Sequence, residues 1–400
     1  MEFLTVDSIE SAREKLISYA GGWLCAKKIL PLEKALGKIL AEDIFAKGDI
    51  PAFRRSSVDG YAVLAENTAA AGESIPVFLN LVGQVEMGKA AGFSISSGEC
   101  AEVPTGGMLP DGATAVVMVE YSEAFGSGIA LYKSAAYGEN VVQAGEDAKC
   151  GTLLLKRGKL ILPQDIGALA AAGINNVPVF APPRLTIIST GDELVHPSLN
   201  PMPGQVRDIN TYALMALAEK IGFEAVSSAI APDEPEALEN AVRGAMDISD
   251  IVVVSGGSSK GKKDMTKDVL DKLSAPGVFT HGLAVKPGKP TILGFDENSK
   301  TILAGLPGHP VSAMIIFELI FNWLFREITG AAGQMKIPAR LSSNVASSPG
   351  KLTCQPCSLL LNGSGYIAEP TFGKSGLITT LTKADGFFMI GRGTEGITEG

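Results

Sequence analysis

The apolar and polar positions near the N-terminus follow helical spacing. Asp7 and Glu10 are spaced as in a capping box, which predicts a helix that opens there and runs to about Ser18. A second helical pattern lies at residues 32–40. Residues 75–142 differ, because their short β-rich runs are separated by glycines. This spacing predicts a compact β domain inserted between helical segments.

The helical pattern returns before a long stretch of alternating elements. Residues 163–172 predict a helix, with Pro163 suited to its first turn and Gly173 to its C-terminal cap. After the APPR boundary at 181–184, strand and helix patterns alternate with short links, and the strands are continuously apolar. That combination is typical of a parallel sheet covered on both faces. Past residue 330, short β runs and glycine turns predict a small C-terminal β domain.

Length and composition agree with several domains, because the 400 residues exceed one ordinary core and 46% of them are apolar. We predict a protein of the α/β and β classes. A central three-layer α/β domain with a mostly parallel sheet is joined by an inserted β-rich domain, a helical linking domain and a small C-terminal β-barrel-like domain. The predicted boundaries are 1–50 with 146–180 for the discontinuous linking domain, 51–145 for the inserted domain, 181–330 for the α/β domain and 331–400 for the C-terminal domain.

Charge and hydropathy argue against several classes of protein. The net charge of −9 argues against a general nucleic-acid or membrane-surface binder. The acidic, amphipathic N-terminus is unlike a signal peptide. The most apolar helical stretch, 311–325, is interrupted by Glu318 and is shorter than the ~20 residues that a membrane span needs, so we predict a buried core helix. We expect a cytoplasmic protein.

The cysteines predict neither a disulfide framework nor a metal site. Five cysteines in a chain of 400 residues are too few for a disulfide scaffold. Cys354 and Cys357 form a lone CxxC with no second pair and no nearby histidine, whereas zinc needs about four ligands.

Three loops follow apolar strands and carry polar residues. They are TGDELV with Asp192 and Glu193, GGSSKGKKD at 256–264, and LPGHP at 306–310. Ligands of open α/β sheets bind outside the carboxyl ends of the strands, so these loops predict one cleft.

Two basic loops suit anions. The GGSSKG run offers glycines, hydroxyls and free N–H groups ahead of a helix, together with neighbouring lysines, which suits a phosphate. It matches neither the P-loop nor the dinucleotide fingerprint, and a glycine turn with a solvated lysine face remains an alternative. Lys286 and Lys289 lie on a turn rigidified by Pro287 and Pro290, which suits an oxyanion. Ordinary surface lysines are the alternative there.

The acidic candidates and the histidine also have plain structural interpretations. Asp59 with Gly60 fits an Asp-Gly turn, and Asp147 is similarly ambiguous. Asp233 and Asp264 fit helix caps. The three histidines are scattered and support no Ser/His/Asp triad, and His309 alone lies in a promising loop, where it also fits a turn between prolines.

Nine segments taken in order resemble a known family. They are SSVDGYAV, PTGGMLPDGATAVVMVE, GEDAKCG, LPQDIGALAAAGI, STGDELV, GQVRDINTYAL, GGSSKG, VKPGKP and LPGHPVSA. This order is similar to that of the molybdopterin molybdenumtransferases, the MoeA-type molybdenum insertases that include the C-terminal domain of gephyrin. The resemblance extends over nearly the whole chain.

The resemblance implies a function in molybdenum cofactor biosynthesis. Such proteins insert molybdenum from molybdate into adenylylated molybdopterin and release AMP with a divalent cation, usually Mg²⁺. They are dimers of four-domain subunits whose cleft, beside the molybdopterin-binding α/β domain, includes parts of the partner. The implied partners are a second copy and the small anionic substrates, with a molybdopterin adenylyltransferase and molybdoenzyme-maturation proteins as further candidates.

The family's site residues transfer by motif to this chain. The catalytic candidates are Asp59, Asp147, Glu193, Asp233, Asp264 and Lys286. The substrate-binding candidates are Thr105, Gly256, Gly257, Ser258, Gly261, Lys289, Pro290, Pro307, Gly308, His309, Ser312 and Ser375. Carboxylates of this set can hold the cation or orient an attacking oxygen, while lysines and N–H groups offset the charge of the two anions. Which carboxylate binds metal stays open.

The chain departs from the family pattern at several positions. Val58 replaces a methionine, GGSSKG replaces GGVSVG, and the Lys262–Lys263 pair follows where an acidic residue is common. His309 replaces an asparagine. Pro356 aligns with an anion-binding arginine, whose bidentate fork a proline cannot supply, so Lys260 or His309 is the candidate to compensate.

Three alternatives to an active molybdenum insertase stay open. A paralogue could bind a pterin-nucleotide or a partner protein with weak or no turnover, because fold does not imply function. An insertase adapted to tungstate is a second alternative. A nucleotide-binding oxidoreductase is the third, although the chain lacks the dinucleotide fingerprint.

Overall fold

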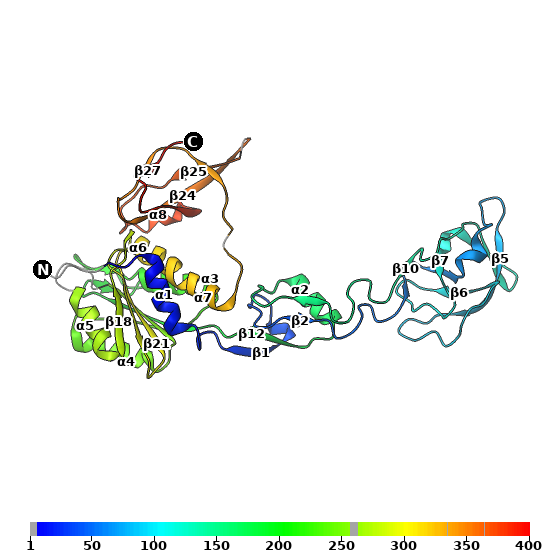
Figure 1. The fold of residues 1–400 in the computed structure, drawn as a ribbon, viewed down its shortest axis with the longest axis horizontal. Coiled ribbons are helices and arrows are strands. Elements are labelled where there is room, and N and C mark those ends of the chain that lie inside the picture. The colour runs from blue at the N-terminus through cyan, green and yellow to red at the C-terminus, as the bar shows by residue number, and fades with distance from the viewer. Residues whose placement is uncertain (1–5, 257–262, 334, 364) are drawn as a thin grey trace. The chain divides into compact units, whose positions relative to one another are not determined.

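The computed structural model describes residues 6–256, 263–333, 335–363 and 365–400 (Figure 1). Contacts divide the chain into two compact units. The first unit comprises Met1–Lys28, Gly158–Leu160 and Val179–Gly400. The second comprises Ile29–Arg157 and Ile161–Pro178.

A six-stranded sheet forms the centre of the first unit. Its strands lie in the order β16 (Glu224–Ala231), β13 (Arg184–Thr190), β17 (Ile251–Gly256), β21 (Thr301–Leu306), β20 (Ile292–Asp296) and β18 (Pro276–His281). The first four are mutually parallel, whereas β20 runs antiparallel to both of its neighbours. The continuously apolar strands β17 and β21 are buried along almost their whole length, as strands covered on both faces must be. The predicted, mostly parallel sheet is confirmed.

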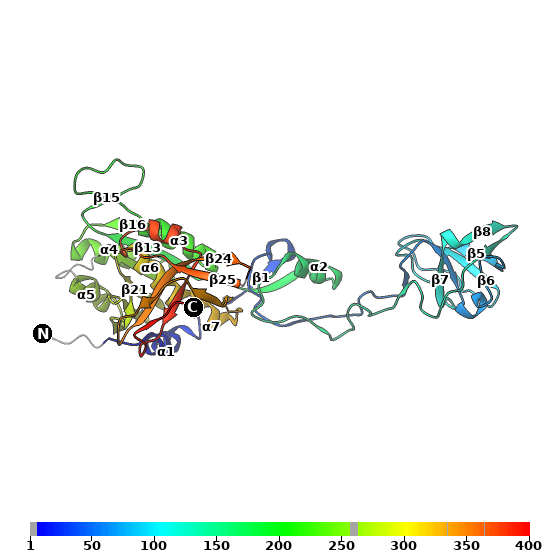
Figure 2. The same ribbon diagram turned by 90° about the horizontal axis from the view of Figure 1, so that it is seen from above.

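Helices cover both faces of this sheet, which gives the predicted three layers (Figures 1 and 2). One face carries α4 (Pro235–Met246) and α5 (Lys263–Leu273), whose apolar sides join a core with Ile188, Val252 and Leu303. The other face carries α1 (Ile9–Ala20), α3 (Asn210–Ile221), α6 (Pro310–Phe317) and α7 (Trp323–Thr329). A short π-helical segment, Glu318–Asn322, joins the last two helices.

The apolar stretch at 311–325 is a buried core helix, as predicted. Phe317 and Phe321 within it are among the largest side chains that are fully buried. Arg13 of α1 donates from Nη2 to the carbonyl of Leu319 at 2.6 Å, within the π-helical segment, and stacks over the Trp323 ring. Among the helices that the structure describes, none combines the length and the apolar character needed to cross a membrane.

Helix α1 differs from the sequence prediction in its cap and in its packing. The side chain of Ser8, and not that of Asp7, accepts the N–H of Ser11 at 3.1 Å. Asp7 instead accepts from Lys15 Nζ and from Thr280 Oγ1, both at 2.7 Å. Since these contacts hold the N-terminal segment against the α/β sheet, its described residues 6–28 group with that sheet and not with the linking region.

Replacing the cap residue should measure its contribution. We expect Ser8→Ala to lower the free energy of unfolding by about 1 kcal/mol, because one N–H of the first turn loses its acceptor. Ser8→Asp should keep the stability, since aspartate caps about as well as serine. Urea denaturation followed by circular dichroism measures both, and an unchanged midpoint in Ser8→Ala would contradict the assignment of the cap.

The second unit contains the predicted β-rich domain. Its six-stranded sheet has the order β7 (Ala115–Met118), β4 (Gly60–Val63), β6 (Glu99–Val103), β5 (Val77–Gln84), β9 (Gly128–Leu131) and β8 (Ser122–Phe125). Alternate residues of the central strands enter two apolar clusters, one around Ala101 and Val116 and one around Cys100 and Val117. Short 3-10 turns lie at Ala65–Thr68 and Val119–Tyr121.

Short paired strands and one helix account for most of the rest of the second unit. These elements are β1 (Lys27–Pro31) with β12 (Asn176–Phe180), β2 (Ile44–Phe45) with β11 (Leu153–Leu155), β3 (Arg55–Ser56) with β10 (Val141–Val142), and α2 (Pro163–Ala171). Strands β1 and β12 each extend by two residues into the ranges of the first unit. The helix predicted at 32–40 is wrong, because only the 3-10 turn Leu32–Lys34 forms. Gly37 takes φ +72°, and the backbone of Gly37 and Lys38 pairs with Ile161. This pairing overrides the helical pattern.

The C-terminal residues form the predicted β domain. Its strands are β22 (Ala339–Leu341), β23 (Val345–Ala346), β24 (Leu352–Asn362), β25 (Gly365–Pro370), β26 (Gly386–Ile390) and β27 (Gly396–Ile397), with a short helix α8 (Thr379–Thr382). The main sheet has the order β19-β24-β25-β22, and β26 pairs with β24. Strand β19 (Val285–Lys286) comes from the α/β region, and Lys286 lies opposite Thr353.

All five cysteines are free thiols. Cys354 and Cys357 are both buried in β24, and burial raises the pKa of Cys354 to about 12. Residues three apart on a strand point to opposite faces, so the two thiols do not share one face of the sheet. Thiols that stay protonated are poor metal ligands and nucleophiles.

Candidate active site

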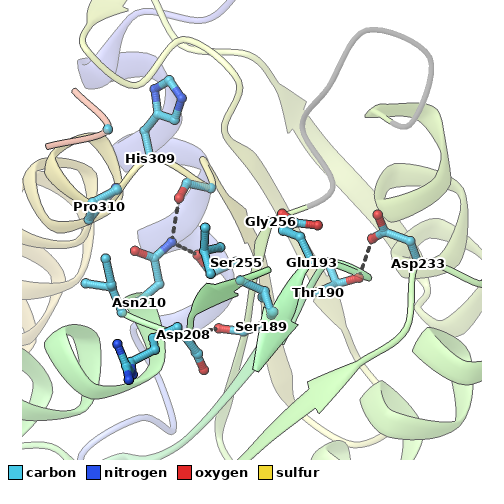
Figure 3. A pocket seen from close by; sticks show the side chains of 16 residues that line it. Ser189, Thr190, Glu193, Asp208, Asn210, Asp233, Ser255, Gly256, His309 and Pro310 are labelled. Carbon is cyan, nitrogen blue, oxygen red and sulfur yellow. Dashed lines mark hydrogen bonds between the residues drawn. The ribbon is translucent and has the colours of Figure 1, made fainter. Parts of the chain in front are cut away.

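One pocket of about 620 Å³ lies at the carboxyl edge of the parallel strands (Figure 3). Its walls come from the ends of β13 and β17 and from the segments that follow β16 and β21. All three loops that the sequence singles out contribute, through Glu193, Gly256 and His309 respectively. The loops meet because the carboxyl ends of neighbouring parallel strands reach the same edge of a sheet. The predicted convergence is confirmed.

Carboxylates gather on one side of this pocket. Thr190 Oγ1 donates to Asp233 Oδ1 at 2.8 Å, and the backbone N–H of Asp233 donates to Asp192 Oδ1 at 3.0 Å. Glu193 lines the same side (Figure 3). Asp233 does not cap the following helix, since α4 has Glu234 at its N-cap position, with no side-chain cap bond. The cap interpretation of Asp233 is therefore wrong.

Buried polar side chains form the floor beneath the opening. Ser189 Oγ donates to Asp208 Oδ1 at 3.0 Å, and the backbone N–H of Thr211 donates to the same oxygen at 3.2 Å. Asn210 Nδ2 donates to Ser255 Oγ and to the carbonyl of Gly308, both at 2.8 Å. Buried groups satisfied in this way fix the strand ends relative to the starts of α3 and α6.

Gly256 lets the strand ends approach closely. Its φ is +124°, and a Cβ built there would lie 2.1 Å from the carbonyl oxygen of Thr190. Only glycine fits a position that combines a positive φ with such a contact. The residue thus sets the shape of the pocket between β13 and β17.

The C-terminal β domain completes one wall. His309 Nδ1 lies 2.7 Å from Ser375 Oγ, and the backbone N–H of Val311 donates to the carbonyl of Ser375 at 3.2 Å. Gly376 lines the pocket next to His309. The wall therefore joins residues from two parts of the sequence.

The charges of the lining are mixed. Glu193, Asp208 and Asp233 carry carboxylates, and Arg207 is a basic neighbour. The starts of α3 and α6 reach the pocket through Asn210 and Pro310, and a helix N-terminus is the positive end of its dipole. The lining thus offers carboxylates for a cation and helix starts for an anion.

Known protein families match three consecutive regions that together cover most of the chain. Residues 7–173 match the MoeA N-terminal region, which comprises domains I and II. Residues 186–326 match a probable molybdopterin binding domain, and residues 338–400 match the MoeA C-terminal region, domain IV. A molybdopterin molybdenumtransferase of Haemophilus influenzae is 30% identical over 390 residues, which span 96% of this chain and 94% of the relative. The chain belongs to the MoeA family.

Further relatives agree with this membership. A molybdopterin molybdenumtransferase of Bacillus subtilis is 32% identical over 92% of this chain and 87% of its own. The crystal structure of a molybdopterin biosynthesis MoeA protein from Pyrococcus horikosii superimposes with a TM-score of 0.85 at 37% identity, over 99% of this chain and 97% of that chain. The resemblance inferred from the nine sequence segments is confirmed.

The pocket contains only part of the residue set transferred from the MoeA family. Glu193, Asp233, Gly256, Gly308 and His309 line it, and Ser375 adjoins it through His309. The transferred residues of the first unit that lie outside this lining are Lys286, Lys289, Pro290, Pro307 and Ser312. Gly257, Ser258 and Gly261, with the neighbouring Lys260 and Lys262, lie outside the described residues.

The backbone of Asp264 lies within a helix. Helix α5 already begins at Lys263, so Asp264 is in its first turn. A cap residue stands just before its helix, whereas Asp264 is the second residue of α5, so the cap interpretation is wrong.

The two lysines of the KPGK turn are exposed beside the C-terminal sheet. Lys286 belongs to β19, which pairs with β24, and Lys289 follows in the turn. The turn is held against α6, because a Cβ on Gly288 would lie 2.4 Å from Ile316 Cγ1. Pro356 of β24 is buried opposite Phe387 of β26, where it offers neither a side-chain charge nor an N–H.

Three transferred residues belong to the second unit. The backbone N–H of Thr105 donates to Asp59 Oδ1 at 2.6 Å, and this bond lowers the pKa of the exposed Asp59 carboxyl. The carboxylate therefore has a specific partner beyond a plain Asp-Gly turn, and it stays ionised at neutral pH. Asp147 is exposed, and its backbone N–H donates to the carbonyl of Ile50 at 3.0 Å.

Sequence reasoning missed five buried polar residues of the pocket, namely Ser189, Thr190, Asp208, Asn210 and Ser255. Each is largely buried and hydrogen-bonded. A usable signal was present for three of them, because polar residues end otherwise apolar strands at Ser189, Thr190 and Ser255. In the described part of the chain, no three His, Cys, Asp or Glu side chains are grouped so that they could hold a metal ion by themselves.

Proposed function

We propose that this chain is a molybdopterin molybdenumtransferase, which inserts molybdenum from molybdate into adenylylated molybdopterin and releases AMP. The observation that carries the proposal is the pocket at the carboxyl edge of the sheet, in a chain whose full-length relatives bear that name. The pocket combines carboxylates, helix starts and a glycine that admits close approach, which suits a phosphate-bearing ligand.

The chain's own groups would position the substrate before bond cleavage. Phosphate oxygens fit at the starts of α3 and α6, where N–H groups and dipoles favour negative charge. The buried network of Asn210, Ser255 and Gly308 keeps that wall in place, so little reorganisation is needed when charge builds up. In the reaction, water cleaves the phosphoanhydride, so that AMP leaves and the pterin keeps its own phosphate, and molybdenum from molybdate binds to the pterin with loss of oxygen as water.

A magnesium ion fits this chemistry. Mg²⁺ is usually bound by one or two protein carboxylates together with substrate phosphates, so the absence of a three-ligand group in the described residues does not oppose it. Glu193 and Asp233 line the pocket and would hold the ion. When bound, Mg²⁺ supplies charge stabilisation at the phosphoanhydride. Thr190 orients Asp233 through its 2.8 Å hydrogen bond.

We assign a second anion-binding part of the site, for molybdate, to the KPGK turn. Lys286 and Lys289 are exposed cations on a turn fixed against α6, which suits molybdate. Pro290 and the buried Ser312 of α6 belong to the same proposed part of the site. Tungstate has so similar a charge and size that both oxyanions should be compared.

Incubation with adenylylated molybdopterin, Mg²⁺ and either oxyanion tests the proposal. We expect AMP release that requires molybdate or tungstate, with metal incorporated into the pterin in proportion. Tight pterin-nucleotide binding without AMP release would instead support a binding paralogue. Pro356 favours that alternative, because the position has no guanidinium for an oxyanion.

The proposal extends to assembly and location. We propose a cytoplasmic homodimer, with a molybdopterin adenylyltransferase and molybdoenzyme-maturation proteins as candidate partners. Size-exclusion chromatography with light scattering tests the dimer, and a monomer at micromolar concentration would contradict it.

Asp59 offers a test outside the pocket of the first unit. Asp59→Asn keeps an oxygen for the Thr105 N–H but removes the charge, so we expect intact folding and about tenfold slower AMP release. Glu73→Gln, at another exposed acidic residue of the same unit, is the control and should keep the wild-type rate. A wild-type rate in Asp59→Asn would remove this residue from the proposed machinery.

A further inference from the structure

The inserted β-rich sheet of the second unit carries two exposed aromatic rings on its outer face. Phe78 of β5 and Phe125 of β8 are 56% and 65% exposed, and their ring centroids lie 4.8 Å apart. Their chain neighbours Leu79 and Ala124 both lie opposite Ile129, which is part of the core. Because side chains alternate along a strand, the two rings point to the other face of the sheet, toward solvent. They form an apolar patch there.

Strand β8 also has an open edge, because it is an end strand of the sheet and pairs, among the described strands, with β9 alone (Figure 2). Phe125 and Gly128 flank a two-residue turn, so their backbones hydrogen-bond to each other, and such pairs alternate along a hairpin. The N–H and C=O of Ala124 therefore point away from β9. At the other end of the sheet, the Val116 N–H of β7 donates to the carbonyl of Glu139, so that edge is covered.

The aromatic pair and the open edge adjoin, since Ala124 and Phe125 are consecutive residues of β8. An extended segment added beside β8 would take up the free backbone groups of Ala124 and direct every second side chain to the face with the rings. Backbone contacts would give affinity, and the rings would select apolar side chains. The edge has only four residues and carries the charged Glu123, which favours a specific partner over general aggregation.

The charge of the domain distinguishes between the candidate occupants of this surface. Residues 51–145 contain ten acidic side chains and four basic ones, in a chain whose net charge is −9. Lys89 and Lys133 are already paired with glutamates within the domain. Glu123 lies two residues before Phe125 and therefore on the same face, where it is exposed. A second copy of this chain would bring two acidic surfaces together, whereas a basic segment would be attracted.

We propose that the open edge of β8 binds an extended segment of another protein by strand addition. In that segment, an apolar residue opposite Phe125 packs on the two rings, and a basic residue two positions away pairs with Glu123. The inference goes beyond the proposed function, and it uses no residue of the pocket or of the KPGK turn. The partner is thus recognised by an apolar and a basic side chain on one face of a strand.

A pair of short synthetic peptides tests the proposal on the full-length chain. Both alternate valine and threonine around one tryptophan, and they differ only two positions from the tryptophan, where one has lysine and the other glutamate. We expect the lysine peptide to bind about tenfold more tightly at low ionic strength, measured by fluorescence anisotropy of the labelled peptides. Glu123→Lys should reverse this preference, because the cross-strand pair with the lysine peptide then has like charges.

Two variants separate the aromatic face from the strand edge. Phe125→Gln should weaken binding of the lysine peptide by about tenfold, because the apolar anchor is lost. Ala124→Pro should weaken it to a similar extent, since proline removes the outward N–H and is tolerated on an edge strand. Phe53→Gln, at another exposed phenylalanine of the same unit, is the control and should bind like wild type. AMP release should keep the wild-type rate in all three, which separates this test from that of the proposed function.

Amide hydrogen exchange provides a readout that needs no variant. The Ala124 N–H should exchange about tenfold more slowly when the lysine peptide is bound, because strand addition gives it an acceptor. Absence of binding, equal binding of the two peptides, or an unchanged exchange rate at Ala124 would each overturn the proposal. A dimer that dissociates in Phe125→Gln would also overturn it, because a second copy would then be the occupant of this face.

Discussion

Gly256→Ala is expected to destabilise the protein by roughly 3 kcal/mol and to abolish AMP release. The added Cβ would lie 2.1 Å from the carbonyl oxygen of Thr190, and the φ of +124° is unfavourable for any residue with a side chain. The opposing atom belongs to the backbone of β13, so relief of the clash must displace the strand that carries Thr190. Thermal unfolding and the AMP-release assay measure the two effects.

Gly244→Ala is a matched control for this prediction. Gly244 lies inside α4, and a Cβ there would meet no atom within 4 Å. The same substitution should therefore stabilise the protein by about 0.5–1 kcal/mol, since alanine is the better helix former. If Gly256→Ala stabilised the protein as Gly244→Ala does, the inferred close approach of β13 and β17 at Gly256 would be contradicted.

Asp233→Asn should lower AMP release by about 100-fold or more while the fold persists. Asparagine keeps an oxygen that accepts the Thr190 hydroxyl, so the hydrogen bond survives. The negative charge is lost, and with it the proposed contribution to magnesium binding. Raising the Mg²⁺ concentration should restore part of the rate, because a weakened cation site is filled again by mass action.

Asp247→Asn provides the comparison for the loss of charge. Asp247 is an exposed residue at the C-terminal end of α4, outside the pocket lining. We expect its rate and its magnesium dependence to match wild type. A rate near wild type in Asp233→Asn as well would exclude this carboxylate from the mechanism.

Much of the fold was predictable because its pattern is set by burial. Strands β17 and β21 are covered on both faces, and they read as continuous apolar runs. The same logic placed the three loops at one edge, because parallel strands must end together there. Sequence pattern thus predicted both the sheet and the position of its pocket.

Long-range pairing limited the prediction elsewhere. Residues 32–40 have helical spacing, but the backbone of Gly37 and Lys38 pairs with Ile161, a partner far away in the sequence. Ser8 and Asp7 are both suitable caps by type, and the contact of Asp7 with Thr280 decided between them. Such choices depend on partners that a local pattern does not contain.

The site was harder to predict than the fold. Asp208 and Asn210 precede or begin a helix, where polar residues are common for local reasons, so nothing in the spacing distinguished a pocket floor from a cap. For Asp233 the local pattern indicated only a cap, because its partner, Thr190, lies on another strand, and its place among the catalytic candidates came from the family resemblance.

Strand β19 has a consequence for how the protein can be divided. Val285 and Lys286 are contributed by the α/β region yet hydrogen-bond into the C-terminal sheet, alongside Leu352 and Thr353. A fragment truncated at residue 330 would leave β19 without its partner strand β24. An isolated C-terminal fragment would expose the unpaired edge of β24 where β19 normally pairs. Any shift of that sheet would also be transmitted to Lys286. The α/β region and the C-terminal domain therefore cannot be separated without disturbing the proposed oxyanion-binding turn, because both contribute to the sheet that contains Lys286.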